Sequence, residues 1–423
     1  MWSIDSKYDV IIAGGGVAGW AAAIAASEAG AKVLLVEKES GPGGVATFSG
    51  CPVFMGFGET GKQCIGGLGE CLMRRLDAIH ALADSADGQP LGDRPVTSIY
   101  TTTEPQLMLV LNRMLKEAKV DLLYYTMVSG VRCTNGMIEA LELFFCGEKT
   151  TVRAPMYIDA TGDAVIAAMA GCPVNTGATE DSMTKTVLFK VNNVSSFDKP
   201  DLRRRFSDIC RAGRFPYKNQ DLFMGSRLGQ SDEVLLNMSL AVGNAMNPHE
   251  LTAMDIELRE QIFVILDWLR HELPEFKNCK LVNIAPKIGV RAGRNIIGRE
   301  NITCEDLIND APVSEPVAVG RRWFGGHGIN SFASPWEKGV HGWRSVPYGA
   351  LKPQNIDNLL VCGRAIGVET RAITAIRYLS SCMATGQAAG AAAAISARNG
   401  SSPPYSLIKD ELLKQNAILT PPE

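Results

Sequence analysis

A strand, a glycine-rich turn and a helix open the chain, and they constrain its fold more than any other feature. The apolar run 8–13 leads into a turn of the pattern GxGxxG, Gly14-Gly15-Gly16-Val17-Ala18-Gly19. Gly14 permits the tight turn, Gly16 lets the backbone approach a pyrophosphate, and Gly19 lets the following helix pack closely on the strand. The first amides of that helix then face an anion.

A second strand, 32–37, completes a βαβ unit. It ends in Glu37, 21 residues after Gly16, where a carboxylate can accept hydrogen bonds from both hydroxyls of a ribose. The turn alone is a weak signal, but in this context it predicts that the chain binds a dinucleotide through the turn, Glu37 and the neighbouring Lys38. NAD and FAD share this pattern, so the rest of the sequence must distinguish them.

Composition narrows the class of protein. The 423 residues carry a formal net charge of −3 with scattered lysine and arginine, so we expect no nucleic-acid partner. Residues 1–9 do not resemble a signal peptide and glycines interrupt the apolar stretch 10–29, so we expect neither secretion nor a membrane span. The eleven cysteines include no CxxC pair and no zinc-ligand spacing, which indicates no metal site and reduced thiols in a cytoplasmic protein.

The apolar pattern predicts a discontinuous first domain. After a helix at 105–119, three strands form a β-meander, with a hairpin turn at Asn135-Gly136, and a strand at 152–160 follows. The middle of the chain mixes short strands with one long helix, and the buried-strand pattern returns near residue 359 before an alanine-rich helix. We therefore predict an α/β fold: a Rossmann-like dinucleotide-binding domain (βαβ and β-meander) of residues 1–172 and 347–400, an inserted α+β substrate or cap domain of 173–346, and a C-terminal tail of 401–423. The strands expected beyond residue 119 are 120–126, 128–133, 138–146, 152–160, 185–191, 233–242 and 359–363, and the helices are 251–273 and 380–398.

Four stretches of sequence resemble the FAD-dependent oxidoreductases of the glutathione-reductase-like superfamily, in the branch of the fumarate reductase and tricarballylate dehydrogenase flavoproteins. The resemblance covers about half of the chain, and it implies bound FAD. The stretches that carry it are 14–19 with Glu37, Gly43-Gly44-Val45-Ala46-Thr47, Ala160-Thr161-Gly162-Asp163, and 358–364 leading to 382–390.

The resemblance also implies a role for each stretch. Residues 43–47 would run beside the pyrophosphate and the flavin, and Asp163 would lie near the adenosine or pyrophosphate. Gly363 and Arg364 would approach the ribityl chain, where many relatives have Gly-Asp. The predicted FAD-binding residues are Gly14, Gly16, Val17, Ala18, Gly19, Glu37, Lys38, Gly43, Gly44, Val45, Ala46, Thr47, Val128, Ala160, Thr161, Gly162, Asp163, Gly363, Arg364, Ala384, Thr385 and Gly386.

The last helix has two interpretations. Its N-terminal amides would stabilise negative charge at the N1/O2 edge of a reduced flavin. Alternatively, small residues such as Gly386 and Gly390 merely allow close helix packing, and the two interpretations are compatible.

Residues 173–346 contain no second GxGxxG turn, so we expect no NAD(P)H domain. Electrons would come from a small-molecule substrate or from a separate electron donor or acceptor, with hydride transfer between flavin N5 and substrate carbon. Arg291 and Arg294 are candidates to bind a substrate carboxylate, against an ordinary salt bridge. His327 and His341 are candidates for acid/base catalysis, against structural loop histidines.

Weaker candidates surround these residues. Tyr348 is a possible site residue or a core residue, and one of Arg371 and Arg377 could reach the pocket. Cys51 could carry a covalent flavin link, against a small buried thiol. Two rival functions stay open: a flavin-dependent oxidase or monooxygenase, and a non-catalytic FAD-binding protein. The sequence leaves the substrate, the direction of the reaction and the oligomeric state open.

Overall fold

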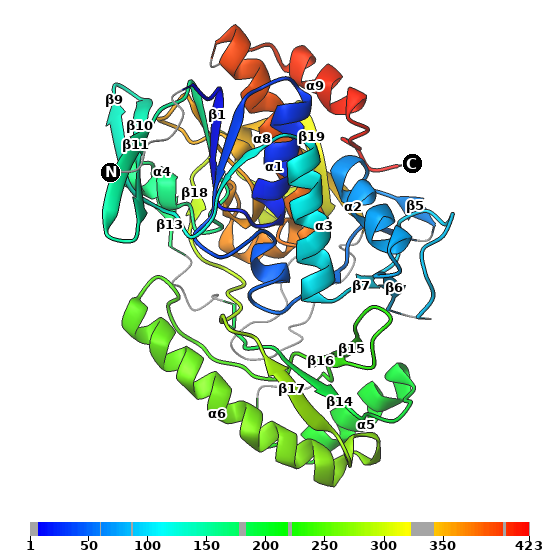
Figure 1. Cartoon of the computed structure of the whole chain (residues 1–423). Helices are drawn as coiled ribbons and strands as arrows, with labels where there is room; N and C mark the ends of the chain where they lie inside the picture. Colours follow the sequence, from blue (N-terminus) through cyan, green and yellow to red (C-terminus); the bar gives the residue numbers. More distant parts are fainter. Residues whose placement is uncertain are drawn as a thin grey trace.

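Two layers make up the molecule, as Figure 1 shows: a larger one around β1, α1 and α8, and a smaller one below it around α6. No helix among the residues described is long and apolar enough to cross a membrane. The computed structural model describes residues 7–59, 61–85, 88–176, 183–218, 222–322, 342–400 and 403–422.

A five-stranded parallel sheet with the order β21-β12-β1-β2-β8 is the centre of the larger layer. Four of its strands are wholly buried and rich in valine, isoleucine and leucine, as expected of a parallel sheet covered on both faces. The predicted α/β class and Rossmann-like arrangement are confirmed. The strands are β1 (Val10–Ala13), β2 (Val33–Val36), β8 (Asp121–Leu123), β12 (Met156–Asp159) and β21 (Leu359–Val361).

Two helices of small residues, α1 (Val17–Glu28) and α8 (Leu379–Asn399), lie against each other beside this sheet. A Cβ at Gly386 would lie 2.1 Å from the Ala18 carbonyl oxygen, and one at Gly390 would lie 2.1 Å from the Ala22 carbonyl oxygen. The backbones therefore touch, which only glycine allows. The helices α2 (Gly67–Ala78) and α3 (Glu104–Glu117) pack beside them.

The β-meander lies one strand later than predicted. The expected strand 120–126 contributes β8 to the parallel sheet, and the meander is formed by β9 (Met127–Thr134), β10 (Met137–Phe145) and β11 (Glu148–Val152). The predicted Asn135-Gly136 turn is present, with φ of 49° and 77°. The second turn uses Cys146 and Gly147, also with positive φ, and cysteine is not a residue that signals such a turn.

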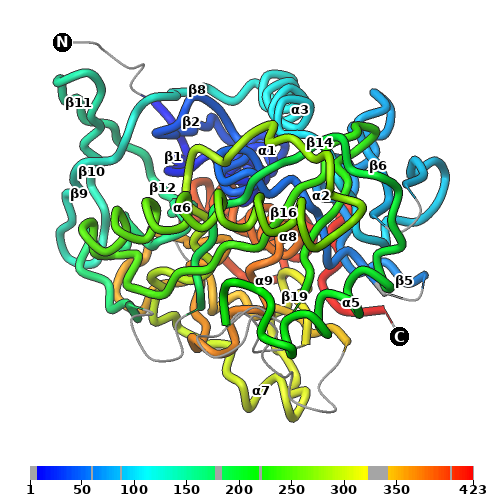
Figure 2. The backbone as a smooth tube through the Cα atoms, turned by 90° about the horizontal axis from the view of Figure 1, so that it is seen from below, coloured from blue at the N-terminus to red at the C-terminus, as the bar shows by residue number. Residues whose placement is uncertain are grey.

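The smaller layer is an antiparallel four-stranded sheet with the order β15-β16-β14-β17, packed on α5 (Lys199–Arg211) and α6 (Pro248–Glu272). Its core is aromatic, with Phe206 and Phe215 both edge-on to Trp268. In Figure 2, seen from that side, α6 and β14 lie in front of α1 and α8. The strands are β14 (Phe189–Asn192), β15 (Gly225–Arg227), β16 (Val234–Leu236) and β17 (Lys280–Ile284).

The hydrophobic cores of the larger and the smaller layer divide the chain near residue 290. Residues 187–288 contribute to the core of the smaller layer, whereas Ala292 and the strands that follow pack with the larger layer. The predicted boundaries at 173 and 346 stay predictions. The remaining elements are β3 (Val53–Phe54), β4 (Gly58–Glu59), β5 (Lys62–Gln63), β6 (Ala83–Asp84), β7 (Tyr100–Thr101), β13 (Val174–Asn175), β18 (Asn295–Ile296), β19 (Pro316–Arg321), β20 (Trp343–Pro347), α4 (Val165–Met169), α7 (Cys304–Asn309) and α9 (Tyr405–Lys414).

One buried ion pair joins the layers, and a second one lies within the smaller layer. Lys190 on β14 places its Nζ 2.9 Å from Glu104 Oε2 at the start of α3 and 2.9 Å from Glu233 Oε2 beside β16. The backbone amide of Gly229 also donates to Thr101 Oγ1. The smaller layer is therefore fixed on the larger one by specific polar contacts.

We predict that Gly390→Ala lowers the free energy of unfolding by about 2 to 3 kcal/mol, because the new methyl group overlaps the Ala22 carbonyl and forces α1 and α8 apart. Urea unfolding of the purified protein measures the change. Ala397→Ser, on the half-exposed end of the same helix, is the matched control. Equal stability of the glycine variant and the wild type would show that the helices do not touch here.

Candidate functional site

The turn before α1 leaves open space for a ligand at one glycine only. A Cβ at Gly14 would lie 2.4 Å from the Ala160 carbonyl oxygen, and one at Gly19 would lie 1.8 Å from the Gly14 carbonyl oxygen, so both glycines are required by packing. A Cβ at Gly16 would meet no atom within 4 Å. Gly16 is also the N-cap of α1, and no side chain caps the helix. The free amides and the open space fit a pyrophosphate.

Glu37 is held against this turn at the end of β2. Its side chain accepts hydrogen bonds from the Gly15 amide, at 2.5 Å, and from the Glu39 amide, at 2.8 Å. The residue is only 6% exposed, so the carboxylate is fixed in orientation and suited to bind a ribose.

An open groove of about 470 Å³ lies beside Lys38 and Glu39, directly after Glu37 in the chain. The Lys287 Nζ closes one side of it through an ion pair of 3.0 Å with Glu39 Oε1. Met127 lines the groove, whereas Val128, the next residue of β9, packs against the hydrophobic core, so its predicted contact with FAD stays a prediction. The lining residues are Lys38, Glu39, Phe48, Met127, Pro286 and Lys287.

The glycine-rich loop runs beside the turn. Gly43, with φ of 111°, donates its amide to the Gly15 carbonyl at 2.8 Å, and Gly44 begins the single 3-10 turn Gly44–Ala46. Thr47 closes this turn by donating its hydroxyl to the Pro42 carbonyl at 3.0 Å, while Val45 is exposed. Residues 43–47 thus border the open space at Gly16.

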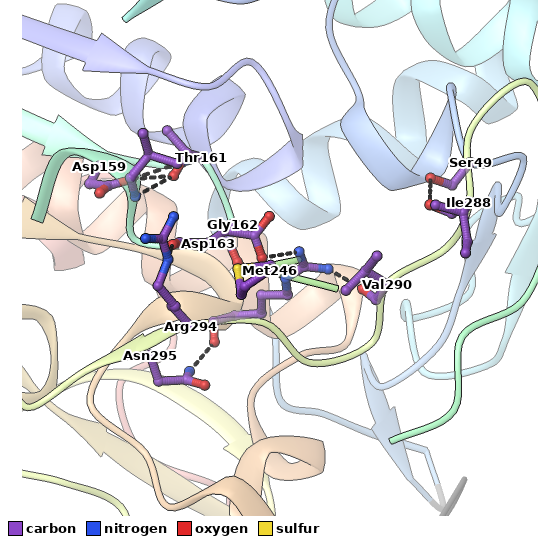
Figure 3. A network of polar contacts seen from close by, with 12 residues as sticks. Ser49, Asp159, Thr161, Gly162, Asp163, Met246, Ile288, Val290, Arg294 and Asn295 are labelled. Carbon is purple, nitrogen blue, oxygen red and sulfur yellow. Dashed lines mark hydrogen bonds and ion pairs between the residues drawn. The ribbon is translucent and has the colours of Figure 1, made fainter. Parts of the chain in front are cut away.

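Arg364 stands at the position where many relatives have aspartate, and its guanidinium has structural partners of its own. Its Nε donates to the Gly162 carbonyl at 2.7 Å, and its Nη2 pairs with Asp163 Oδ1 at 2.7 Å. Its Nη1 donates to the Val290 carbonyl. The guanidinium therefore joins the strand ends of β12 and β21 to the segment that leads out of the smaller layer, the polar network of Figure 3.

Several of the predicted FAD contacts also have structural roles. The Thr161 hydroxyl donates to Asp159 Oδ1 at 2.6 Å, and Thr385 Oγ1 accepts the Gly363 amide at 3.1 Å. The Gly386 contact with Ala18 supports the packing interpretation of α8, and Ala384 is only partly buried beside it. Ser381 Oγ, in the first turn of α8, is buried without a hydrogen-bond partner among the described residues.

Three cations gather where the layers meet. Arg291 is 9% exposed, and it donates to the Thr184 carbonyl at 2.7 Å and to Asn237 Oδ1 at 3.2 Å. Burial, and then the charge of Arg377, lowers the pKa of Arg291. The guanidinium stays protonated at neutral pH, and the direction of the shift shows that positive charge is unfavourable at this place.

Lys185, beside Thr184, is the site residue that sequence reasoning missed. Its side chain is 1% exposed, and burial, followed by the charges of Arg291 and Arg364, lowers its pKa to about 8. The predicted strand 185–191 did contain a signal, because a lysine is out of place in a run of buried β-branched and apolar residues. In the structure, Lys185 forms only an isolated bridge with Ala241, and the regular strand begins at Phe189.

Arg377 and Cys51 lie on the other side of Arg291, whose charge acts on Lys185 as well as on Cys51; the three cations Lys185, Arg291 and Arg377 are called the cationic cluster below. The Arg377 Nε is buried without a hydrogen-bond partner in the described part of the chain, whereas Arg371 is exposed. Burial raises the pKa of the Cys51 thiol, although Arg291 and Arg377 oppose the shift. The thiol is therefore protonated at neutral pH, so it is a poor nucleophile for a covalent link.

The remaining candidate residues from the sequence are Arg294, Tyr348, His327 and His341. Arg294 donates its Nε to the Asp163 carbonyl at 2.9 Å, which turns it toward the predicted pyrophosphate end. Tyr348 belongs to the hydrophobic core, where burial raises the pKa of its hydroxyl. His327 and His341 lie outside the described residues.

The fold has a parallel sheet and an uncapped helix behind an open glycine, and the loop 43–47 borders that open space. These features define a dinucleotide-binding enzyme of the Rossmann-like class. The chain belongs to the FAD-dependent oxidoreductase family, whose model matches residues 9–414. FAD is therefore its cofactor, and the open turn at Gly16 fits it. The contact of each individual residue with FAD stays a prediction.

Known structures share the fold. The p-nitrophenol 4-monooxygenase of Pseudomonas putida is 12% identical, with a TM-score of 0.52 over 97% of this chain and 85% of that one. The myxobacterial chondrochloren halogenase, which is FAD-dependent, is also 12% identical, with a TM-score of 0.50 over 97% of this chain and 79% of that one. No curated protein sequence matches the chain. At such low identity these likenesses concern the fold alone.

We predict that Gly16→Val folds normally but purifies with less than about a tenth of the wild-type FAD content. The valine side chain meets no protein atom near its Cβ and instead fills the space for the pyrophosphate. The flavin absorbance per protein and the thermal midpoint of the apoprotein measure the two effects. Normal FAD content in the variant would place the pyrophosphate elsewhere.

Proposed function

We propose that this enzyme oxidises or reduces a small organic anion by hydride transfer between a substrate carbon and flavin N5. The observation that carries the proposal is the cationic cluster of Lys185, Arg291 and Arg377. Bound FAD would supply the hydride acceptor or donor, and the chain would supply binding, orientation and a proton route.

The cluster favours an anion on electrostatic grounds. The charge of Arg377 lowers the pKa of Arg291, and the charge of Arg291 lowers that of Lys185, so the cations repel one another in a buried place. A carboxylate between Arg291 and Arg377 would relieve this repulsion, and charge-assisted hydrogen bonds would fix its orientation. A substrate carbon attached to that carboxylate would then be held in one position, which is the main contribution a protein makes to hydride transfer.

The cluster lies at the end of the loop that borders Gly16. Cys51 donates its amide to the Val45 carbonyl at 3.2 Å, and Ser49 donates its hydroxyl to the Ile288 carbonyl at 3.3 Å. This loop therefore leads from the predicted pyrophosphate space to the cations. The position supports a substrate site beside the flavin ring and below the smaller layer.

Several finer points belong to the same proposal. The specific likeness to the fumarate reductase branch, a separate electron donor or acceptor, a cytoplasmic location and proton transfer by His327 or His341 are all hypotheses. The oxidase or monooxygenase alternative differs in one property, because it requires rapid reoxidation of the reduced enzyme by O2.

Anaerobic titration tests the proposed function. The oxidised holoenzyme is mixed with a panel of small saturated carboxylates and with uncharged alcohols of the same size, and the dithionite-reduced enzyme is mixed with unsaturated carboxylates. We expect the flavin absorption to bleach or return with a carboxylate and not with its uncharged counterpart. Reactivity with the uncharged compounds alone, or rapid reoxidation by O2 alone, would contradict the proposal.

We predict that Arg377→Met raises the KM for the reacting carboxylate about 10- to 100-fold, because a charge-assisted hydrogen bond contributes roughly 1.5 to 3 kcal/mol. Arg371→Met, six residues away and exposed, is the matched control and should leave KM unchanged. Steady-state kinetics of both variants at equal FAD content provide the comparison. Equal KM values for the two variants would remove Arg377 from the substrate site.

A further inference from the structure

Asn237 is a polar side chain that lies directly against Arg291. It follows β16, where its backbone amide donates to the Met224 carbonyl at 2.9 Å. Arg291 Nη2 lies 3.2 Å from Asn237 Oδ1, and the Thr186 hydroxyl lies 3.0 Å from the same oxygen. The carboxamide is therefore fixed in place by contacts with two segments that are distant in the sequence.

These contacts determine which end of the amide faces the arginine. A guanidinium carries only donors, so the atom that Arg291 meets must be the amide oxygen. The Nδ2 group of Asn237 lies on the opposite side of the amide carbon. Its two N–H donors have no hydrogen-bond partner among the residues that the structure describes, and the side chain is partly exposed.

The unmatched donors of Asn237 are within reach of a ligand that binds Arg291. The oxygen and the nitrogen of one amide are about 2.2 Å apart, so Nδ2 lies within roughly 5.5 Å of Arg291 Nη2. Hydrogen bonds of about 2.9 Å from both groups can meet neighbouring oxygens of one small molecule. The guanidinium suits a carboxylate, and the uncharged amide suits a neutral oxygen, which costs less to bury than a second anion.

We propose that Asn237 is a specificity-determining residue of the substrate site and selects carboxylates that carry an oxygen on the next carbon, C2. The substrate class is then the 2-hydroxy acids and the 2-oxo acids. Arg291 binds the carboxylate, and Asn237 Nδ2 donates to the C2 oxygen. The inference rests on the proposed function for the carboxylate, and it adds the second group that the substrate must have.

This substrate class fits the proposed hydride transfer. In a 2-hydroxy acid, C2 carries both the hydrogen that leaves with its electron pair to flavin N5 and the oxygen that Asn237 holds. The hydroxyl proton leaves to solvent as the C2=O bond forms, so a 2-oxo acid and the two-electron-reduced cofactor result. Contacts on the carboxylate and on the C2 oxygen together orient the reacting carbon.

Binding of matched acids to the oxidised, FAD-loaded protein tests the inference without turnover, because a 2-oxo acid has no hydride on C2 to give. Pyruvate differs from propionate, and 2-oxoglutarate from glutarate, by the C2 oxygen alone. We expect a 2-oxo acid to bind about tenfold more tightly than its matched partner, because the partner leaves the Asn237 donors without an acceptor. Calorimetry and the change in flavin absorption give the Kd values.

The variant Asn237→Asp removes the donors and keeps the contacts of the amide oxygen. One carboxylate oxygen still accepts from Arg291 and Thr186, while the other replaces Nδ2 with an acceptor. The new charge weakens the binding of both acids, so the ratio of their Kd values is the measure, and it should fall to about one. Asn283→Asp, on the exposed strand β17, adds the same charge and should keep the wild-type ratio.

Two results would overturn the inference alone: equal Kd values within both pairs for the wild type, or an unchanged ratio in Asn237→Asp. The FAD content and the thermal midpoint show whether the variant is folded, and the wild-type ratio tests the inference without it. If none of the acids binds, the proposed function fails together with the inference. Binding of the acids without discrimination therefore separates the two failures.

Discussion

The contact between α1 and α8 is the constraint on which the rest of the structure depends. Gly386 lies on Ala18 and Gly390 lies on Ala22, so the helices run in the same direction with their backbones touching. Their N-termini therefore point to the same end of the molecule. The start of α8 extends six residues farther than that of α1, roughly 9 Å at 1.5 Å per residue. Parallel helix dipoles repel each other, and negative charge at both N-termini offsets that cost.

This geometry suits an extended cofactor with negative charge along its length. The open space at Gly16 lies at the nearer helix end, and the buried Ser381 hydroxyl lies in the first turn at the farther one. Glu37 touches the turn beside this space, and the loop 43–51 leads from the same space toward the cationic cluster. FAD, with adenosine, pyrophosphate and flavin in sequence, matches this order of groups. The ion pair of Lys190 with Glu104 fixes the smaller layer on the larger one.

Much of this arrangement could be predicted from the sequence, because local patterns carried it. The GxGxxG turn, Glu37 and the buried strands each report a physical requirement that shows in a few consecutive residues. The helix 251–273 was expected on apolar spacing and is found at Pro248–Glu272. The β-meander was predicted one strand too early. Its second turn is at Cys146-Gly147, where Cys146 has positive φ, and a cysteine in the sequence does not indicate such a turn.

Arg291 and Arg377 were separate candidates from the sequence, but Lys185 and the gathering of the three cations could not be predicted in the same way. Lys185, Arg291 and Arg377 are separated by about a hundred residues each, and only the docking of one layer on the other brings them together. Arg364 shows the same limit, since its partners at Gly162 and Val290 lie far away in sequence. A site assembled from distant segments has no local pattern, so its charges become recognisable only when burial and mutual repulsion are known.

Hydrogen exchange of the protein with and without FAD tests the convergence of these segments most directly. We expect FAD to protect the amides of 15–19, 43–47, 161–164 and 379–386 together, and to leave the exposed strand β17 unchanged. Protection limited to the first of these segments, or absent from all four, would contradict the account, because a single cofactor would then not link the two helix ends.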